Sequence, residues 1–129
     1  MSDEPIDDLL RLNKRLIESI SKANWLAYAE LCDPTMSAFE PESVGHLVEG
    51  MEFHRYYFGL ARNDAHVNLT MVAPKVRVMG DVAVVSYVRL DQRLDTGGAP
   101  ITVAFDETRV WQKQDGRWKH VHFHRSRAD

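Results

Sequence analysis

The sequence lacks several features that would assign it to large classes of protein. It has one cysteine, Cys32, which excludes an internal disulfide and favours a reducing compartment. No apolar run approaches the roughly 18 residues that a membrane-spanning helix requires. The acidic start has no basic flank followed by an apolar stretch, so no secretory signal is visible. We therefore expect a cytoplasmic protein that contacts no membrane.

Positive charge is not in excess, and this bears on the partners. The formal net charge is −3, whereas a nucleic-acid-binding protein needs basic groups to neutralise phosphates. Glycine-rich phosphate loops of the P-loop and kinase types are missing from the sequence. We expect no nucleic-acid partner, no cofactor and no kinase catalysis by this chain.

What is present is an ordinary globular composition of modest size. The chain has 129 residues, of which 44% are hydrophobic and 27% are charged. A chain of this size buries roughly two-thirds of its unfolded surface, which supports one core without disulfides or a structural metal. We expect one domain over residues 1–129.

The first half of the sequence has helical periodicity. Apolar residues at helical spacing predict a first helix, which Ser2 or Asp3 would cap. A short second helix should follow Asn24 and end at the Asp33–Pro34 step, because the residue before proline avoids the helical region. Residues 36–40 suggest a short strand, and residues 43–62 suggest a third helix. The apolar stripe of that third helix comprises Val44, Leu47, Met51, His54 and Phe58.

From His66 onward the apolar residues recur with period two. Glycine-containing turn signals separate four strand-like runs, at about 67–79, 82–93, 101–113 and 117–125. Helices followed by a meander of strands predict an α+β fold: a cone-shaped, curved antiparallel sheet with the N-terminal helices packed on its concave face.

Three arginines share the phase of apolar residues on three of the predicted strands. Arg89, Arg109 and Arg125 each alternate with inward-facing side chains, because alternate residues of a strand share a face. A charge that points into a core must be paired or must reach water or a ligand. We therefore expect an anion site, with a structural ion pair between Arg109 and Glu107 as the competing interpretation.

The register adds a condition to this expectation. Arg109 and Arg125 share a face only if the residue numbers of directly paired positions on their two strands add up to an even number. A two-residue Asp115–Gly116 turn would place them on opposite faces unless a strand is bulged. We therefore predict a three-residue loop, 114–116, with Gly116 in the left-handed region.

The histidines and the cysteine offer weaker signals. His120, His122 and His124 alternate along the last strand and should form a row on one face, more typical of solvent or interface histidines than of a metal site. His54 lies on an apolar stripe, and the sequence leaves two interpretations open: a core histidine, or a pocket residue able to serve as a general base. Cys32 has no basic neighbour in sequence and is a poor candidate nucleophile. We expect no catalytic and no metal-ligating residue.

At this point six segments resemble a known family. The segments are AFEPE at 38–42, LVEGMEFHR at 47–55, YVRL at 87–90, ETRVW at 107–111, DGRW at 115–118 and VHFHRS at 121–126. They resemble the association domain of calcium/calmodulin-dependent protein kinase II, in order, from about Leu12 to Ser126. That family belongs to the wider nuclear transport factor 2-like, or SnoaL-like, superfamily of cystatin-like cone-shaped domains.

The resemblance implies an assembly domain with a pocket. In the kinase this domain joins subunits into two-layered rings built from dimers, and its cone encloses a pocket for small carboxylate-bearing ligands. Arg89, Arg109, Arg125 and His54 match positions of that pocket. Together with Tyr57 and Glu107 they form the ligand-binding set that we expect. Arg62 departs from the family, which often has tryptophan there near the pocket mouth.

Three functions follow as alternatives. We expect a homo-oligomer, at least a dimer because the sequence ends at Asp129 without the tail of the kinases, whose pocket binds a small carboxylate or another anion. An enzyme of the SnoaL-like type, an isomerase, dehydratase or cyclase using His54, is the second reading. It is less favoured because nearby arginines lower the pKa of a base. Pure scaffolding, with arginines that only hold Glu107 and its neighbours, is the third.

Overall fold

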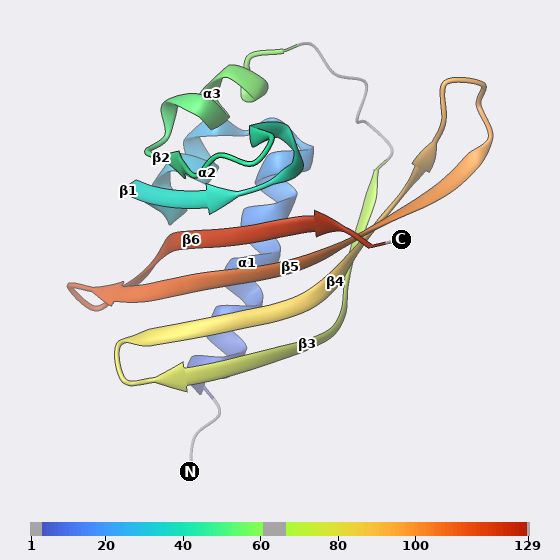
Figure 1. Ribbon diagram of the computed structural model, residues 1–129. Helices are drawn as coiled ribbons and strands as arrows, with labels where there is room; N and C mark the ends of the chain where they lie inside the picture. Colours follow the sequence, from blue (N-terminus) through green and yellow to red (C-terminus); the bar gives the residue numbers. More distant parts are fainter. Residues whose placement is uncertain (1–3, 61–66, 129) are drawn as a thin grey trace.

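The computed structural model describes residues 4–60 and 67–128 of the chain, which form three short-to-medium helices and one sheet (Figure 1). Three residues named in the sequence analysis lie outside the described residues: Arg62, which was expected near the pocket mouth, and the two candidate helix caps Ser2 and Asp3. The elements in chain order are α1 (Glu4–Ser21), α2 (Trp25–Leu31), β1 (Cys32–Phe39), the 3-10 helix η1 (Pro41–Ser43), β2 (Val48–Glu49), α3 (Glu52–Phe58), β3 (Asn68–Met79), β4 (Val82–Leu94), β5 (Pro100–Gln114) and β6 (Arg117–Arg127).

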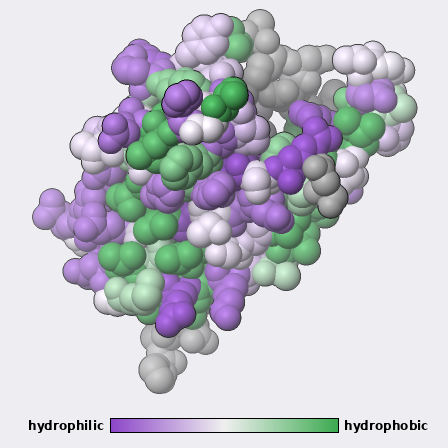
Figure 2. Space-filling view, viewed as in Figure 1, coloured by the Kyte–Doolittle hydropathy of each residue, from purple (hydrophilic) through white to green (hydrophobic). Residues whose placement is uncertain are grey.

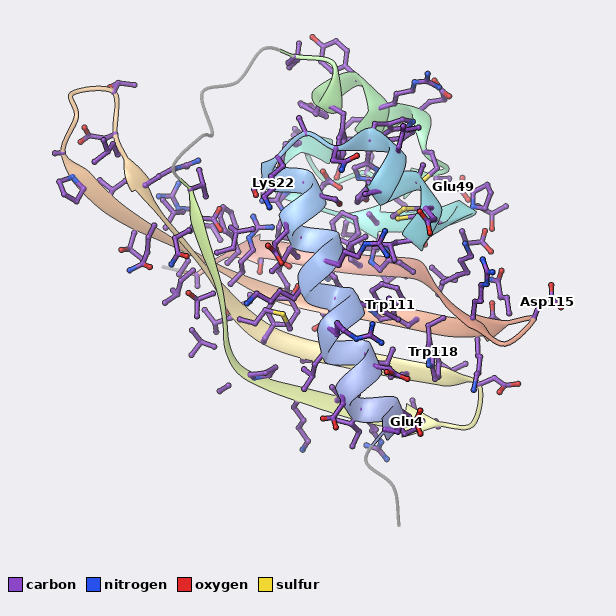
Figure 3. All side chains as sticks on the ribbon, turned by 180° about the vertical axis from the view of Figure 1, so that it is seen from behind. Glu4, Lys22, Glu49, Trp111, Asp115 and Trp118 are labelled. Atoms are coloured by element: carbon purple, nitrogen blue, oxygen red, sulfur yellow. The ribbon has the colours of Figure 1, made fainter. Side chains whose placement is uncertain are left out.

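The sheet has six strands in the order β2-β1-β6-β5-β4-β3. The last four strands form the predicted antiparallel meander, whereas β1 pairs with β6 in parallel. The sheet curves, and α1 crosses one of its faces while α2 and α3 lie beside the β1 end (Figures 1 and 3). The predicted fold class, an α+β curved sheet with N-terminal helices on it, is confirmed. Within the described residues, no helix is long and apolar enough to cross a membrane.

The first two helices predicted from periodicity are present in the structure. The apolar stripe of α1 is buried at Leu9, Leu16 and Ile17. The Asn24 side chain caps α2 by accepting a hydrogen bond from the backbone N–H of Ala27 at 3.2 Å.

The predicted third helix over 43–62 is wrong in its first half, because α3 begins only at Glu52. Val44, Gly45 and Gly50 have φ values of +49°, +84° and +81°, which a right-handed helix cannot contain. Val44 is 81% exposed, so it belongs to no buried stripe.

The β5–β6 hairpin corrects the predicted loop and explains how the arginines still share a face. Gln114 pairs with Arg117, so the turn contains two residues, Asp115 and Gly116, both with positive φ. The predicted three-residue loop is therefore wrong. The ladder shifts between Val110 and Trp111, where β6 contains one extra residue. The two-residue turn alone would place Arg125 on the face opposite to Arg109. The extra residue of the bulge returns Arg125 to the same face.

The core lies between α1, α2 and the inner face of the sheet. Trp111 is fully buried under α1 (Figure 3). Its indole N–H donates to Oδ1 of Asn13, 3.1 Å away, which accounts for a fully buried polar residue that the periodicity did not single out. Tyr28, Met36 and Phe123 complete the centre of the same cluster.

Candidate ligand-binding pocket

A cavity of about 460 Å³ opens at the end of the sheet opposite the Asp115–Gly116 turn. Its walls come from the inner face of β4, β5 and β6, from α1 and α3, and from the segment around η1. The volume lies in the range of pockets for small organic molecules. Five of the six expected ligand-binding residues line it: His54, Tyr57, Arg89, Arg109 and Arg125.

The strand register arranges the inner face in rows that run across the sheet, from the closed end of the cavity to its mouth. Each row contains one residue from each of β4, β5 and β6. Successive rows are two residues, or about 7 Å, apart along the strands. The rows are Val85–Arg109–Phe123, then Tyr87–Glu107–Arg125, then Arg89–Phe105–Arg127.

Glu107, the sixth expected residue, lies behind the arginines rather than in the cavity wall. It is 2% exposed, and its Oε1 accepts hydrogen bonds from the Tyr87 hydroxyl at 2.5 Å and from Nη2 of Arg109 at 3.0 Å. Its Oε2 lies 2.9 Å from Nη1 of Arg89. Burial raises the pKa of Glu107, but the charges of Arg109 and Arg89 outweigh burial and hold the pKa below its usual value.

Arg109 is a fixed structural cation. Its side chain is buried, and its three nitrogens contact Glu107, the Tyr87 hydroxyl at 3.0 Å and Nε2 of His120 at 3.3 Å. Its guanidinium also lies 4.4 Å from the ring centre of Phe123. Burial disfavours the charge, yet Glu107 opposite raises the pKa of Arg109, so the group stays protonated. The expected structural ion pair with Glu107 is therefore present.

Arg89 is also paired within the protein. It bridges Glu107 and Asp91, whose Oδ1 lies 3.0 Å from the Arg89 Nε. Burial raises the pKa of Asp91, and Arg89 only partly opposes that effect. Asp91 lines the cavity and was missed by the sequence reading, although it shares the phase of Arg89 on β4 and that phase could have found it.

Arg125 forms an ion pair with Glu42, which belongs to η1. The Arg125 guanidinium also lies 4.8 Å from the ring centre of Phe105. Two further arginines line the mouth, Arg93 on β4 and Arg127 on β6, and both are exposed. The sequence reading missed Glu42 and these two arginines as site residues. Both arginines continue the phase of the predicted strands, which was the available signal.

His54 is held in place by Glu40. Its Nε2 lies 2.6 Å from Oε2 of Glu40, and both side chains are buried in the cavity wall. Its Nδ1 is buried without a hydrogen-bond partner among the described residues, with the rings of Tyr28, Phe53 and Phe123 around the imidazole. A base must reach the proton that it abstracts, so this geometry suits a positioning contact better than general-base catalysis.

The predicted row of three histidines on β6 is wrong, because the bulge at Val121 separates them. His120 points inward, is fully buried, and lies 3.5 Å from the Sγ of Cys32 through its Nδ1. His122 contacts the Ser37 hydroxyl at 2.8 Å on the other face, where His124 is exposed. The described residues contain no group of three or more His, Cys, Asp or Glu side chains placed to hold a metal ion.

Cys32 sits in an environment that suppresses its reactivity. Burial raises the pKa of its thiol to about 12, and the nearby Arg109 charge offsets this only in part. The geometry therefore favours a structural cysteine.

Comparison with known proteins places this arrangement in a family. The sequence matches the family described as the calcium/calmodulin-dependent protein kinase II association domain over residues 6–129. It is 43% identical over 122 residues to the delta subunit of that kinase from Oryctolagus cuniculus, covering 92% of this chain and 23% of the kinase subunit. The chain thus spans about a quarter of that curated relative.

Solved structures agree. The hub homology domain of Chlamydomonas reinhardtii is 50% identical, with a TM-score of 0.90 over 97% of this chain and 99% of that one. The association domain of C. elegans is 43% identical, with a TM-score of 0.91 over the same shares. A nuclear transport factor 2-like protein of Salmonella enterica, 21% identical with a TM-score of 0.76 over 95% of this chain and 90% of that one, shares the fold. The chain belongs to the calcium/calmodulin-dependent protein kinase II association domain family.

Proposed function

We propose that this chain is a homo-oligomeric association module whose pocket binds a small carboxylate. The assembly half rests on identity of 43–50% to association and hub domains that match nearly the whole chain. The sequence carries no kinase motif, so the proposal includes no phosphoryl transfer.

The outer face of the sheet is the surface that suits a second copy of the chain. Hydrophobic side chains gather there over β3, β4 and β5 (Figure 2). They alternate with the buried residues of β4 and β5, so they point away from the core. A monomer rarely leaves a large contiguous apolar surface uncovered. The side chains are Val72, Val84, Val88, Leu90 and Val110.

Solution mass tests the assembly half. The wild type should elute at the mass of a dimer or a larger oligomer, and Val84→Arg should give a monomer that keeps its circular dichroism spectrum. Val110→Lys, directly opposite on β5, tests the same face independently. The control is Leu26→Arg on α2, which also alters an exposed hydrophobic residue, 81% exposed. A monomeric wild type, or dissociation by the control alone, would contradict the proposal.

The pocket half is supported by the contact between Arg125 and Glu42. A carboxylate already occupies the guanidinium that faces the cavity, which indicates the group that this position accepts. Among the described residues, five arginines line the cavity, namely Arg89, Arg93, Arg109, Arg125 and Arg127, against the three carboxylates of Glu40, Glu42 and Asp91. The lining therefore carries a positive excess.

Calorimetric titration with a short monocarboxylate such as hexanoate tests the pocket half. Arg125→Gln should weaken binding about tenfold or more, because a charge-assisted hydrogen bond is lost. Arg117→Gln, at the far end of β6, is the matched control. Undiminished binding in Arg125→Gln would place the acid elsewhere.

A further inference from the structure

The charge of the pocket changes with depth. The three deeper arginines, Arg89, Arg109 and Arg125, each contact a carboxylate of the protein itself. At the mouth, Arg93 and Arg127 have no ion pair and no side-chain hydrogen bond among the described residues, although both line the cavity. Among the described residues, the arginines of the pocket that form no ion pair therefore lie at its mouth.

The register fixes where these two arginines stand. Arg127 follows Arg125 by two residues on the same face of β6, so it lies about 7 Å closer to the mouth. Arg93 lies on the inner face of β4, four residues or about 14 Å beyond Arg89, whose row contains Arg127. Asp91 forms its ion pair with Arg89, with 3.0 Å between Oδ1 and Nε, and the Arg93 charge, which also lowers the pKa of Asp91, acts on it without an ion pair among the described residues.

Apolar side chains also contribute to the cavity wall. The Phe105 ring lies 4.8 Å from the Arg125 guanidinium carbon, and Phe105 pairs directly with Arg127 across the strands. Ile17, Ile20 and Leu69 also line the cavity. A ligand that reaches from Arg125 to the mouth would therefore place a hydrocarbon segment along this wall.

We propose that the pocket selects a linear organic dianion rather than a monocarboxylate. One carboxylate lies at Arg125, where the Glu42 carboxylate now lies, and the second anionic group lies at Arg127, one row closer to the mouth, with Arg93 further out along β4. The spacing of about 7 Å between the levels corresponds to a dicarboxylic acid of roughly five to seven carbons. This inference rests on the proposed carboxylate binding and adds the second anionic group.

The test compares acids of equal length. Glutarate, adipate and pimelate are titrated calorimetrically at low ionic strength against pentanoate, hexanoate and heptanoate. The diacids should bind about tenfold more tightly than the matched monoacids, because each gains charge-assisted contacts at the mouth. Affinity should peak within this length range and fall for succinate and for azelate.

Variants assign the two anionic ends. Arg93→Gln with Arg127→Gln should reduce the ratio of diacid to monoacid affinity to near one, because diacid affinity should fall by about tenfold more than monoacid affinity. Arg125→Gln should weaken both classes. Glu42→Gln should tighten both, because it removes the carboxylate that competes for Arg125. Arg117→Gln should change neither.

The outcomes separate this inference from the function that it rests on. Monoacid binding with no diacid advantage, or an advantage that survives the double arginine change, overturns the dianion inference and leaves the carboxylate pocket standing. Absence of binding by both classes overturns the carboxylate pocket, and the dianion inference with it.

Discussion

Glu107 shows how one buried carboxylate organises the interior at the scale of single residues. It contacts Arg89, Arg109 and Tyr87, each from the inner face of the sheet. Removing one partner of a buried ion pair leaves the other charge without compensation, whereas an exposed pair contributes little. The geometry thus predicts a large asymmetry between Glu107 and surface carboxylates.

Glu107→Gln should lower the free energy of unfolding by about 3–5 kcal/mol, measured by urea denaturation, because two buried arginines lose their shared counter-ion. Asp8→Asn is the matched control. It removes an ion pair with Arg11 in which the two side chains are 40% and 68% exposed, and it should change stability by less than about 0.5 kcal/mol. A loss below about 1 kcal/mol in Glu107→Gln would contradict this view of the network.

His120 makes a second prediction at this scale. Burial lowers its pKa well below 6.5, and the adjacent Arg109 charge lowers it further. Below pH 6.5 the unfolded chain takes up a proton that the folded chain refuses, so stability should fall as the pH decreases from about 6.5 to 5. His120→Gln should reduce that slope by up to about 1.4 kcal/mol per pH unit. An unchanged slope in the variant would assign the dependence to other groups, such as His122, whose pKa burial also lowers.

At the scale of elements, the bulge in β6 decides which side chains meet. Val121 is the extra residue between His120 and His122, whose partners on β5 are the adjacent Trp111 and Val110. Without an extra residue, the two-residue turn would place Arg125 on the outer face. Alternation alone correctly predicts four strands, but it cannot locate a bulge, because any residue of the strand fits the pattern locally.

Deletion of Val121 should therefore be tolerated. It leaves His120 inward, His122 outward and Phe123 inward, with the same turn, so the cost should stay below about 3 kcal/mol. Deletion of Thr108 on β5 is the control, because it shifts the faces of Glu107 and Arg109 relative to one another and should abolish cooperative unfolding. Equal damage from both deletions, measured by thermal denaturation, would contradict the register.

At the scale of the whole molecule, the proposed assembly through the outer face of the sheet would link stability to oligomerisation. If copies cover the hydrophobic side chains of β4 and β5, association adds free energy that the separated chain lacks. The midpoint of thermal unfolding should then rise by several degrees as protein concentration increases a hundredfold. In Val84→Arg the midpoint should not depend on concentration. A concentration-independent midpoint in the wild type would show that assembly does not stabilise the fold.

By itself the sequence determined the fold class, the four long strands, the two first helices and the phase that turns Arg89, Arg109 and Arg125 inward. Those features depend on local periodicity and capping, which neighbouring residues encode.

Only the tertiary structure decided what each arginine does in the pocket. A bulge in β6 decided that Arg125 shares a face with Arg109. Contacts between distant segments supplied the partners: Glu42 contacts Arg125 from 83 residues away, and His120 contacts Cys32 from 88 residues away. Contacts at that separation depend on how the elements pack, and strand phase therefore marks arginines as inward without showing which remain available to a ligand. Ion pairs hold Arg89 and Arg109 against Glu107 and pair Arg125 with Glu42, whereas Arg93 and Arg127 have no ion pair among the described residues.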